Sequence, residues 1–140
     1  MESVYAVIDT NVIVSGLLSS KGSPARIVEL LRSGELRSIV DDRITGEYAE
    51  VLARPEFGFP GNEVDILLRQ ILSFSVHAPI GIKSIVVDMP DPSDIPFAEC
   101  AIAFGCPIVT GNRKHYKHEK LKGISILNPS EFIEYLESHC

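Results

Sequence analysis

The chain has 140 residues, of which 45% are hydrophobic and 23% are charged, and its formal net charge is −6 at pH 7. This composition predicts one globular domain over residues 1–140 and excludes a mainly disordered chain. The negative charge disfavours a protein that coats nucleic acid with its whole surface. The most apolar window, residues 95–109, is interrupted by Glu99 and is shorter than the roughly 20 residues that cross a bilayer, so no membrane partner is expected.

The first half of the chain predicts two strands and three helices. Residues 4–8 form a continuous apolar run, which is typical of a parallel strand that is buried on both faces. Capping residues and prolines set the expected helix limits. In chain order, the predicted elements are a strand over 4–8, helices over 12–18 and 23–34, a strand over 37–40, and a helix that begins at Asp42 or Thr45 and ends before Pro55.

The second half continues this alternation. Asn128, Pro129 and Glu131 predict a capping box, with Asn128 as the N-cap of a terminal helix. Strands that alternate with helices indicate a three-layer α/β/α sandwich with a mainly parallel central sheet. In chain order, the predicted elements are a helix over 62–73 that Asn62 caps, one or two short strands within 75–87, a loop over 88–94, a helix over 94–104, strands over 107–110 and 124–127, and a terminal helix to about residue 138.

The cysteines and the first residues of the chain indicate the cellular compartment in which we expect the protein. Cys100, Cys106 and Cys140 include no C-x-x-C pair, which disfavours a disulfide framework and a thiolate zinc site. We interpret Cys100 and Cys106 as small buried hydrophobic residues. The first residues lack the basic start and apolar stretch of a secretory signal, so we expect a cytoplasmic protein.

Polar side chains are predicted to meet at the carboxyl edge of the sheet, where ligands bind in open α/β folds. Asp9 directly follows the first strand, and Asn112 follows the strand over 107–110. Glu47 lies early in the third helix, and Asp94 begins the helix that precedes a central strand. Carboxylates at short range repel one another unless a hard cation neutralises them, so this group favours Mg²⁺ or Mn²⁺. Such an ion supports the cleavage of phosphodiesters.

Each of these residues also has an ordinary structural interpretation. Aspartates cap helices and shape turns, glutamates lie on solvated helix faces, and asparagine after glycine forms turns. Taken one at a time, none of the positions requires a metal ion. The residues concerned are Asp9, Glu47, Glu50, Asp91, Asp94 and Asn112.

Four separated motifs follow one another along the chain. They are VIDTNV with SGLL in residues 7–18, EY with EVLARP in residues 47–55, DPSD with Phe97 and ECA in residues 91–101, and IVTGN with HY in residues 108–116. In this order they resemble the PIN domain family over nearly the whole chain, and most of all its toxin subgroup. The resemblance implies a three-layer α/β/α fold, and it implies the activity of many members, metal-dependent cleavage of single-stranded RNA.

The resemblance also implies roles for individual residues. The metal ligands of the family fall on Asp9, Glu47 and Asp94, and these residues with Asn112 form the implied catalytic set. Many members carry a fourth aspartate where this chain has Asn112, whose amide can hold a metal-bound water but brings no charge. This departure leaves one-metal catalysis and weak activity open. The secondary candidates are Asn11, Glu50 and Asp91, and Glu99 ranks below them.

A basic loop follows Asn112. Five of the 13 lysines and arginines lie within ten residues, at Arg113, Lys114, Lys117, Lys120 and Lys122. We expect this loop to bind RNA, with cations on phosphates and an aromatic or histidine ring stacked on an unpaired base. A solvated loop is the alternative, and zinc at the two histidines is disfavoured because no second ligand pair is evident. The predicted RNA-binding residues are Arg113, Lys114, His115, Tyr116 and Lys117.

Two classes of function follow from these observations. The first is a Mg²⁺- or Mn²⁺-dependent endoribonuclease for single-stranded RNA, which as a member of the toxin subgroup would have an antitoxin protein as its partner. The alternative is a catalytically weak or inactive module that binds RNA or another protein. The helix over 62–73 and the terminal helix are candidate surfaces for a homodimer.

Overall fold

A parallel sheet of five strands forms the centre of the structure. The computed structural model describes residues 4–83, 85–86 and 88–138. The strand order β3-β2-β1-β4-β5 places β1 in the middle, and every neighbouring pair in this described sheet is parallel. The predicted parallel α/β architecture is therefore confirmed. The strands are β1 (Val4–Ile8), β2 (Leu36–Val40), β3 (Val76–His77), β4 (Ile108–Val109) and β5 (Ile126–Leu127).

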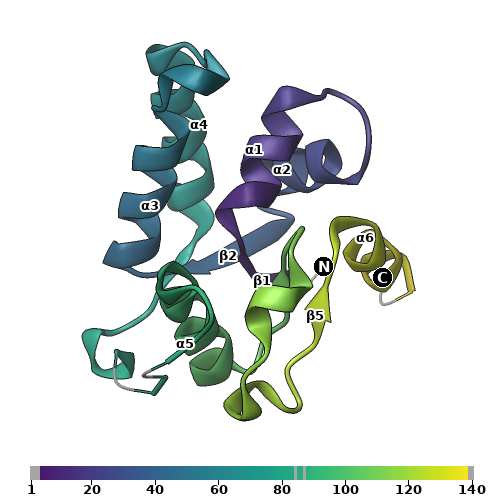
Figure 1. Cartoon of the computed structure of the whole chain (residues 1–140). Coiled ribbons are helices and arrows are strands. Elements are labelled where there is room, and N and C mark those ends of the chain that lie inside the picture. Colours follow the sequence, from purple (N-terminus) through teal and green to yellow (C-terminus); the bar gives the residue numbers. More distant parts are fainter. Residues whose placement is uncertain (1–3, 84, 87, 139–140) are drawn as a thin grey trace.

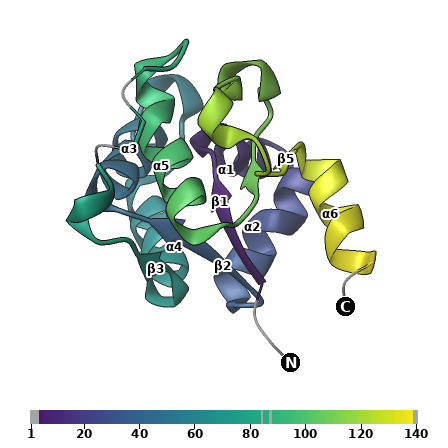
Figure 2. The same cartoon turned by 90° about the horizontal axis from the view of Figure 1, so that it is seen from below.

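Helices cover both faces of this sheet. In Figure 1, α1, α2 and α4 lie above the sheet and α5 lies below it, and Figure 2 shows α6 beside α2. None of the described helices is long and apolar enough to span a membrane. The helices are α1 (Thr10–Leu18), α2 (Ser23–Ser33), α3 (Asp42–Leu52), α4 (Gly61–Phe74), α5 (Ile95–Phe104) and α6 (Pro129–Ser138).

Local capping explains where several helices begin and end. The predicted capping box of α6 is confirmed, since the backbone N–H of Glu131 donates to Oδ1 of Asn128 and the N–H of Asn128 donates to Oε1 of Glu131, both at 2.8 Å. Gly34 is the C-cap of α2; it has φ of 83° and lies against the ring of Phe74. A side chain at Gly34 would require an unfavourable left-handed backbone and would meet that ring.

The structure selects one predicted start for α3 and corrects the start of α4. Helix α3 begins at Asp42, the first of the two predicted starts, and its N-cap is Asp41, which is still extended and whose carboxylate accepts from the N–H of Ile44 at 3.0 Å. Helix α4 begins at Gly61, with Pro60 in the N-cap position, so the helix already includes the predicted cap. Within residues 75–87, the described part holds one strand, β3, and a 3-10 helix, Ile80–Ile82, while residues 84 and 87 lie outside it.

The core lies on both faces of β1 and β2. Ala6, Val7 and Ile8 are fully buried, as expected for a central parallel strand. Cys100 and Cys106 are also buried, which confirms their interpretation as hydrophobic residues. Burial raises the pKa of the Cys100 thiol to about 12 and that of the Cys106 thiol to about 11, so both remain protonated at neutral pH.

Candidate functional site

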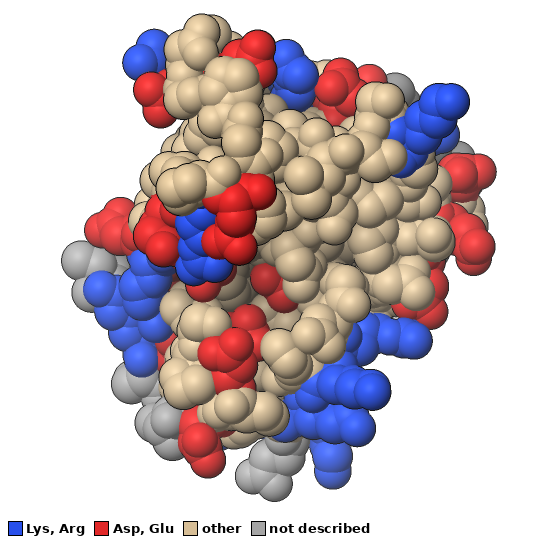
Figure 3. Space-filling view, turned by 45° about the horizontal axis from the view of Figure 1, so that its top comes forward, with Lys and Arg blue, Asp and Glu red and all other residues tan. Residues whose placement is uncertain are grey.

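An acidic cleft opens where β1 ends and α1 begins. Its volume is about 450 Å³, and on the face drawn in Figure 3 acidic side chains surround a hollow with basic side chains gathered nearby. The cleft collects side chains from distant parts of the sequence, because parallel strands end at one edge of the sheet. Its polar lining includes Asp9, Thr10, Asn11, Glu47, Asp91, Asp94, Asn112 and His115.

Asp9 is a buried acid of the cleft and lies directly before α1. Its side chain is buried, and its Oδ2 accepts hydrogen bonds from Thr110 Oγ1 at 2.8 Å and from the Tyr116 hydroxyl at 3.1 Å. Although Asp9 occupies the N-cap position of α1, its side chain makes no capping bond. Burial raises the pKa of this carboxyl group, and the hydrogen bonds oppose the shift. The Asp9 carboxylate is thus held by Thr110 and Tyr116, which lie at and beyond the end of β4.

Glu47 reaches the cleft from the middle of α3. The hydroxyl of Thr10 donates to Oε2 of Glu47, so the first residue of α1 fixes the orientation of this carboxylate. Burial, together with the negative charges of Asp9, Asp91 and Glu50, raises the pKa of Glu47, whereas the Thr10 bond lowers it. The charge state of Glu47 therefore depends on the charges of the neighbouring acids.

Asp94 lies just before α5 and is tied to the residues that follow β4. His115 Nδ1 is 3.1 Å from Oδ2 of Asp94, and His115 Nε2 is 3.0 Å from Nδ2 of Asn112. Like Asp9, Asp94 has the N-cap position of a helix without a side-chain capping bond. Burial and the charges of Asp9 and Asp91 raise the pKa of Asp94 to about 6, against the opposing effect of His115.

Asp91 behaves differently from the other acids of the cleft. Its Oδ1 accepts from the N–H of Ser93 at 3.0 Å and from the Ser93 hydroxyl at 2.8 Å. These hydrogen bonds lower the pKa of Asp91. The ordinary interpretation of Asp91 as a turn residue is thus correct, and Asp91 also lines the cleft.

The donor set of the cleft fits a hard divalent cation. Burial raises the pKa values of three of its carboxyl groups, those of Asp9, Glu47 and Asp94, and the charges of neighbouring acids add to the shifts of Glu47 and Asp94. Among the described lining residues, Arg54 is the one lysine or arginine, and its Nη2 already pairs with Oε2 of Glu50 at 3.0 Å. Carboxylate oxygens without a cationic partner are the ligands that Mg²⁺ and Mn²⁺ prefer.

Comparison with known proteins identifies the family of this chain. The sequence model of the PIN domain matches residues 5–114. The chain belongs to the PIN domain family. It is 28% identical over 143 residues to an uncharacterized protein of Methanocaldococcus jannaschii, which covers 96% of this chain and 92% of that protein. PIN domains are generally nucleases.

A solved structure supports the PIN fold independently. The crystal structure of VapBC2 from Rickettsia felis, bound to a DNA fragment from their promoter, matches 89% of this chain and 98% of that chain. The TM-score is 0.58 and the sequence identity is 15%. At this identity, the likeness shows a shared fold.

Two acids of the PIN motifs lie outside the cleft lining. Glu50 is exposed and pairs with Arg54 one helical turn away, so its predicted secondary role in the site is corrected. Glu99 is fully buried and accepts from Arg43 Nη1 at 2.6 Å and from the N–H of Val86 at 3.1 Å. Arg43 also donates to the cap residue Asp41, so these contacts join the start of α3 to α5.

The residues after Asn112 divide into two groups. Lys114 and Lys117 are exposed, and Arg113 pairs with Glu131 at 3.1 Å. Tyr116 is buried with its hydroxyl on Asp9, so the prediction that its ring stacks on a base is wrong. The ring packs in the hydrophobic core, because the 3-10 helix Arg113–Tyr116 turns it inward.

Sequence reasoning missed the role of Thr110 and gave Asn11 a different one. Thr110 directly follows β4, and β4 pairs with β1, so its hydroxyl lies next to Asp9. Asn11, a predicted secondary ligand, donates to Asp9 at 3.4 Å and accepts from the N–H of Gly111 at 3.0 Å. The available signal was the position of these polar residues at the ends of neighbouring strands.

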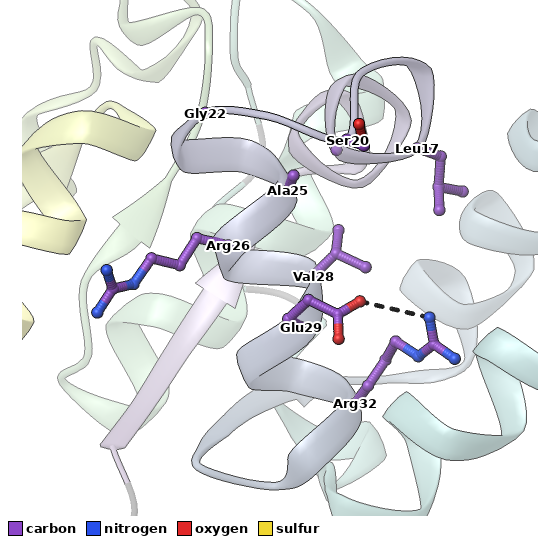
Figure 4. Close-up of a pocket in the computed structure, with 9 residues that line it drawn as sticks. Leu17, Ser20, Gly22, Ala25, Arg26, Val28, Glu29 and Arg32 are labelled. Carbon is purple, nitrogen blue, oxygen red and sulfur yellow. Dashed lines mark hydrogen bonds and ion pairs between the residues drawn. The ribbon is translucent and has the colours of Figure 1, made fainter.

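A second pocket of about 500 Å³ lies against α1 and α2 (Figure 4). Its lining includes Leu17, Val28 and Arg26, and Arg32 Nη1 pairs with Oε1 of Glu29 at 3.4 Å. Within the described part of the chain, one group of three ligand-type side chains has ligand atoms within 4.8 Å of one another, and it consists of Asp91, Asp94 and His115. This group lies in the acidic cleft, whose lining also includes Asp9 and Glu47. The cleft is therefore the candidate site of this PIN domain.

Proposed function

We propose that this PIN domain is an endoribonuclease that cleaves phosphodiesters of single-stranded RNA with Mg²⁺ or Mn²⁺. One observation carries the proposal. The carboxylates of Asp9, Glu47 and Asp94 converge on one cleft with raised pKa values and without a lysine or arginine partner among the described residues. Membership of a family of nucleases supports the same reaction class.

In this proposal, Asp9, Glu47 and Asp94 hold the ion. The bound ion would polarise the phosphodiester and lower the pKa of a water molecule for attack on phosphorus. The chain itself supplies preorganisation, because each carboxylate has a dedicated partner that limits its rotation. These partners are Thr110 and Tyr116 for Asp9, Thr10 for Glu47, and His115 for Asp94.

RNA binding in this proposal depends on the exposed cations beyond the cleft. Lys114 and Lys117 lie in the segment that follows Asn112, and both are exposed. Lysines bind phosphate groups without reading base sequence, so they would hold a strand near the acids rather than select it. We expect this activity in the cytoplasm, in line with the expected location of the protein.

Cleavage of a labelled single-stranded RNA in the presence of Mn²⁺ tests the proposal. We expect Asp9→Asn to lose activity by about a hundredfold or more, because it removes a charged ligand. Asp65→Asn, an exposed substitution on α4, is the matched control and should cleave like the unmodified protein. Cleavage that persists in Asp9→Asn protein, or in excess EDTA, would reject the mechanism.

A regulated toxin is the more specific form of this proposal. The resemblance to the toxin subgroup and the structural likeness to VapBC2 support an antitoxin protein as a partner that inhibits the nuclease. Mixing the protein with a candidate antitoxin should abolish cleavage in a one-to-one complex. A homodimer built on α4 or α6 is a separate proposal that sedimentation analysis tests.

Asn112 favours a second candidate, a PIN module with weak or absent turnover. The amide brings no charge to the cleft, and it contacts His115. Asn112→Asp separates the two candidates. If the substitution leaves cleavage absent while RNA or a protein partner still binds, the binding module is supported and the nuclease is rejected.

A further inference from the structure

We propose that His115 is a ligand of the divalent ion, together with Asp94 and Asp91, and that it makes the site prefer Mn²⁺ over Mg²⁺. The inference rests on the proposed function, because it concerns the same cleft. It adds an imidazole nitrogen to the carboxylate ligands that the PIN motifs supply. It also replaces the sequence-based expectation that this ring contacts RNA.

The spacing of ligand atoms is the first support. One ligand atom each from Asp91, Asp94 and His115 lie within 4.8 Å of one another. Nδ1 of His115 is 3.1 Å from Oδ2 of Asp94. Neighbouring ligand atoms on an octahedral ion with bonds of about 2.1 Å lie about 3 Å apart. The imidazole and the carboxylate therefore already have the separation of adjacent ligands on one ion.

The second ring nitrogen of His115 provides independent support. A histidine that binds a metal through one nitrogen usually has the other held by an oxygen of a neighbouring group. Nε2 of His115 is 3.0 Å from the amide nitrogen Nδ2 of Asn112. A half-turn of that amide exchanges its nitrogen and oxygen, so that Oδ1 accepts from Nε2 when Nδ1 binds the ion. Asn112 is then a positioning residue for the imidazole.

The backbone around His115 keeps the ring at the cleft. His115 lies in the 3-10 helix Arg113–Tyr116, which is anchored at one end by the Tyr116 hydroxyl on Asp9. At the other end, the N–H of Asn112 donates to Thr110 Oγ1 at 3.0 Å, and that hydroxyl donates to Asp9. The side chain of His115 is 38% exposed, so an ion from solvent can reach Nδ1.

The chemistry of the ligand set determines the expected selectivity. Magnesium prefers oxygen ligands and water, whereas imidazole nitrogen suits first-row transition ions. A set of carboxylates with one imidazole therefore binds Mn²⁺ more tightly than Mg²⁺. A site of carboxylates alone would discriminate less between the two ions.

Pulsed electron paramagnetic resonance of bound Mn²⁺ tests this assignment directly, because a coordinated imidazole nitrogen modulates the spin echo. We expect ¹⁴N modulation in the unmodified protein and in the control His77→Gln, whose ring is exposed on β3. His115→Gln should abolish the modulation. Titration calorimetry should show about tenfold weaker Mn²⁺ binding in His115→Gln, with Mg²⁺ binding changed by about twofold or less.

The variant His115→Asp and the unmodified protein separate failure of the His115 assignment from failure of the proposed nuclease site. His115→Asp should retain metal binding and shift the preference towards Mg²⁺, since it restores an all-oxygen site. Mn²⁺ that binds the unmodified protein without ¹⁴N modulation would overturn the His115 assignment and leave the proposed nuclease site standing. Failure of the unmodified protein to bind Mn²⁺ would overturn both.

Discussion

The hydroxyl of Tyr116 donates a hydrogen bond to Oδ2 of Asp9 at 3.1 Å, between residues 107 positions apart in the sequence. The bond joins the end of β1 to the segment after β4. It explains why a tyrosine is buried beneath a charged cleft, since the ring packs in the core while the hydroxyl meets the carboxylate. The acid of the candidate site is thus held from below by the core.

Tyr116→Phe tests this relationship. Loss of the donor should reduce the free energy of unfolding by about 1 to 2 kcal/mol and weaken Mn²⁺ binding by about tenfold, because Asp9 loses a fixed partner. Chemical denaturation and titration calorimetry measure the two effects. Tyr5→Phe, at the start of β1 and away from the cleft, should leave metal affinity unchanged. Equal metal affinity in Tyr116→Phe would show that the hydroxyl does not organise the site.

The pH dependence of the metal-free protein provides a second test. The pKa of Asp94 in the folded protein is about 6, above its ordinary value of 3.8. Protonation is therefore favoured by folding, so the stabilising contribution of this group is fully present below pH 3.8 and is lost as the pH rises through about 6. Asp9 and Glu47 shift in the same direction. Without metal, these groups should make the protein less stable at pH 7 than at about pH 5.

Asp94→Asn should remove much of this dependence. At pH 7 the metal-free variant should be more stable than the unmodified protein by on the order of 2 kcal/mol, because the unfavourable buried charge is absent. Urea denaturation at both pH values measures this difference. Saturating Mn²⁺ should stabilise the unmodified protein at pH 7 and have little effect on the variant. A metal-free Asp94→Asn protein that is less stable than the unmodified one at pH 7 would contradict the electrostatic account.

The ion pair between Arg43 and Glu99 lies outside the cleft lining and should stabilise the fold. Glu99 is fully buried, and its Oε1 is 2.6 Å from Nη1 of Arg43. Glu99→Gln should lower the free energy of unfolding by about 2 to 3 kcal/mol, since a largely buried pair is broken. Glu29→Gln breaks the exposed pair with Arg32 and should cost about 0.5 kcal/mol or less. Similar losses in the two variants would contradict the burial argument.

Two glycines in helices provide a matched pair of alanine substitutions. A Cβ on Gly16 in α1 would lie 2.6 Å from Val28 Cγ2 and 2.7 Å from the carbonyl oxygen of Pro24. Gly16→Ala should therefore destabilise the protein by about 1 to 3 kcal/mol, because α1 and α2 must separate. A Cβ on Gly46 in α3 meets nothing within 4 Å, so Gly46→Ala should stabilise by up to about 1 kcal/mol. Thermal denaturation compares them, and stabilisation by both would refute the close packing.

Local signals predicted most of the fold. The apolar run of β1 is recognisable from sequence because both faces of the strand are buried. The capping box of Asn128 and Glu131 is recognisable because both partners lie within one helical turn. The sequence left the start of α3 open between Asp42 and Thr45, because both residue types begin helices. The structure begins the helix at Asp42, since Asp41 remains extended and caps it.

The burial of Tyr116 and the partners of Glu99 and Asp94 could not be predicted from the sequence, because they depend on contacts between distant segments. The burial of Tyr116 depends on how the segment after β4 folds back over β1. Glu99 meets Arg43 across 56 positions, and His115 meets Asp94 across 21 positions. None of these pairs has a fixed spacing that a sequence pattern encodes, because tertiary packing sets each of them.

A crystal of the protein soaked in Mn²⁺ tests the central claim most directly. The anomalous difference map should show a peak in the acidic cleft, bonded at about 2.2 Å to carboxylate oxygens of Asp9 and Asp94 and to Nδ1 of His115, with Glu47 and Asp91 bound directly or through water. A map with no peak in the cleft at saturating Mn²⁺, or with an ion that is bound outside the acidic cleft, would contradict the account.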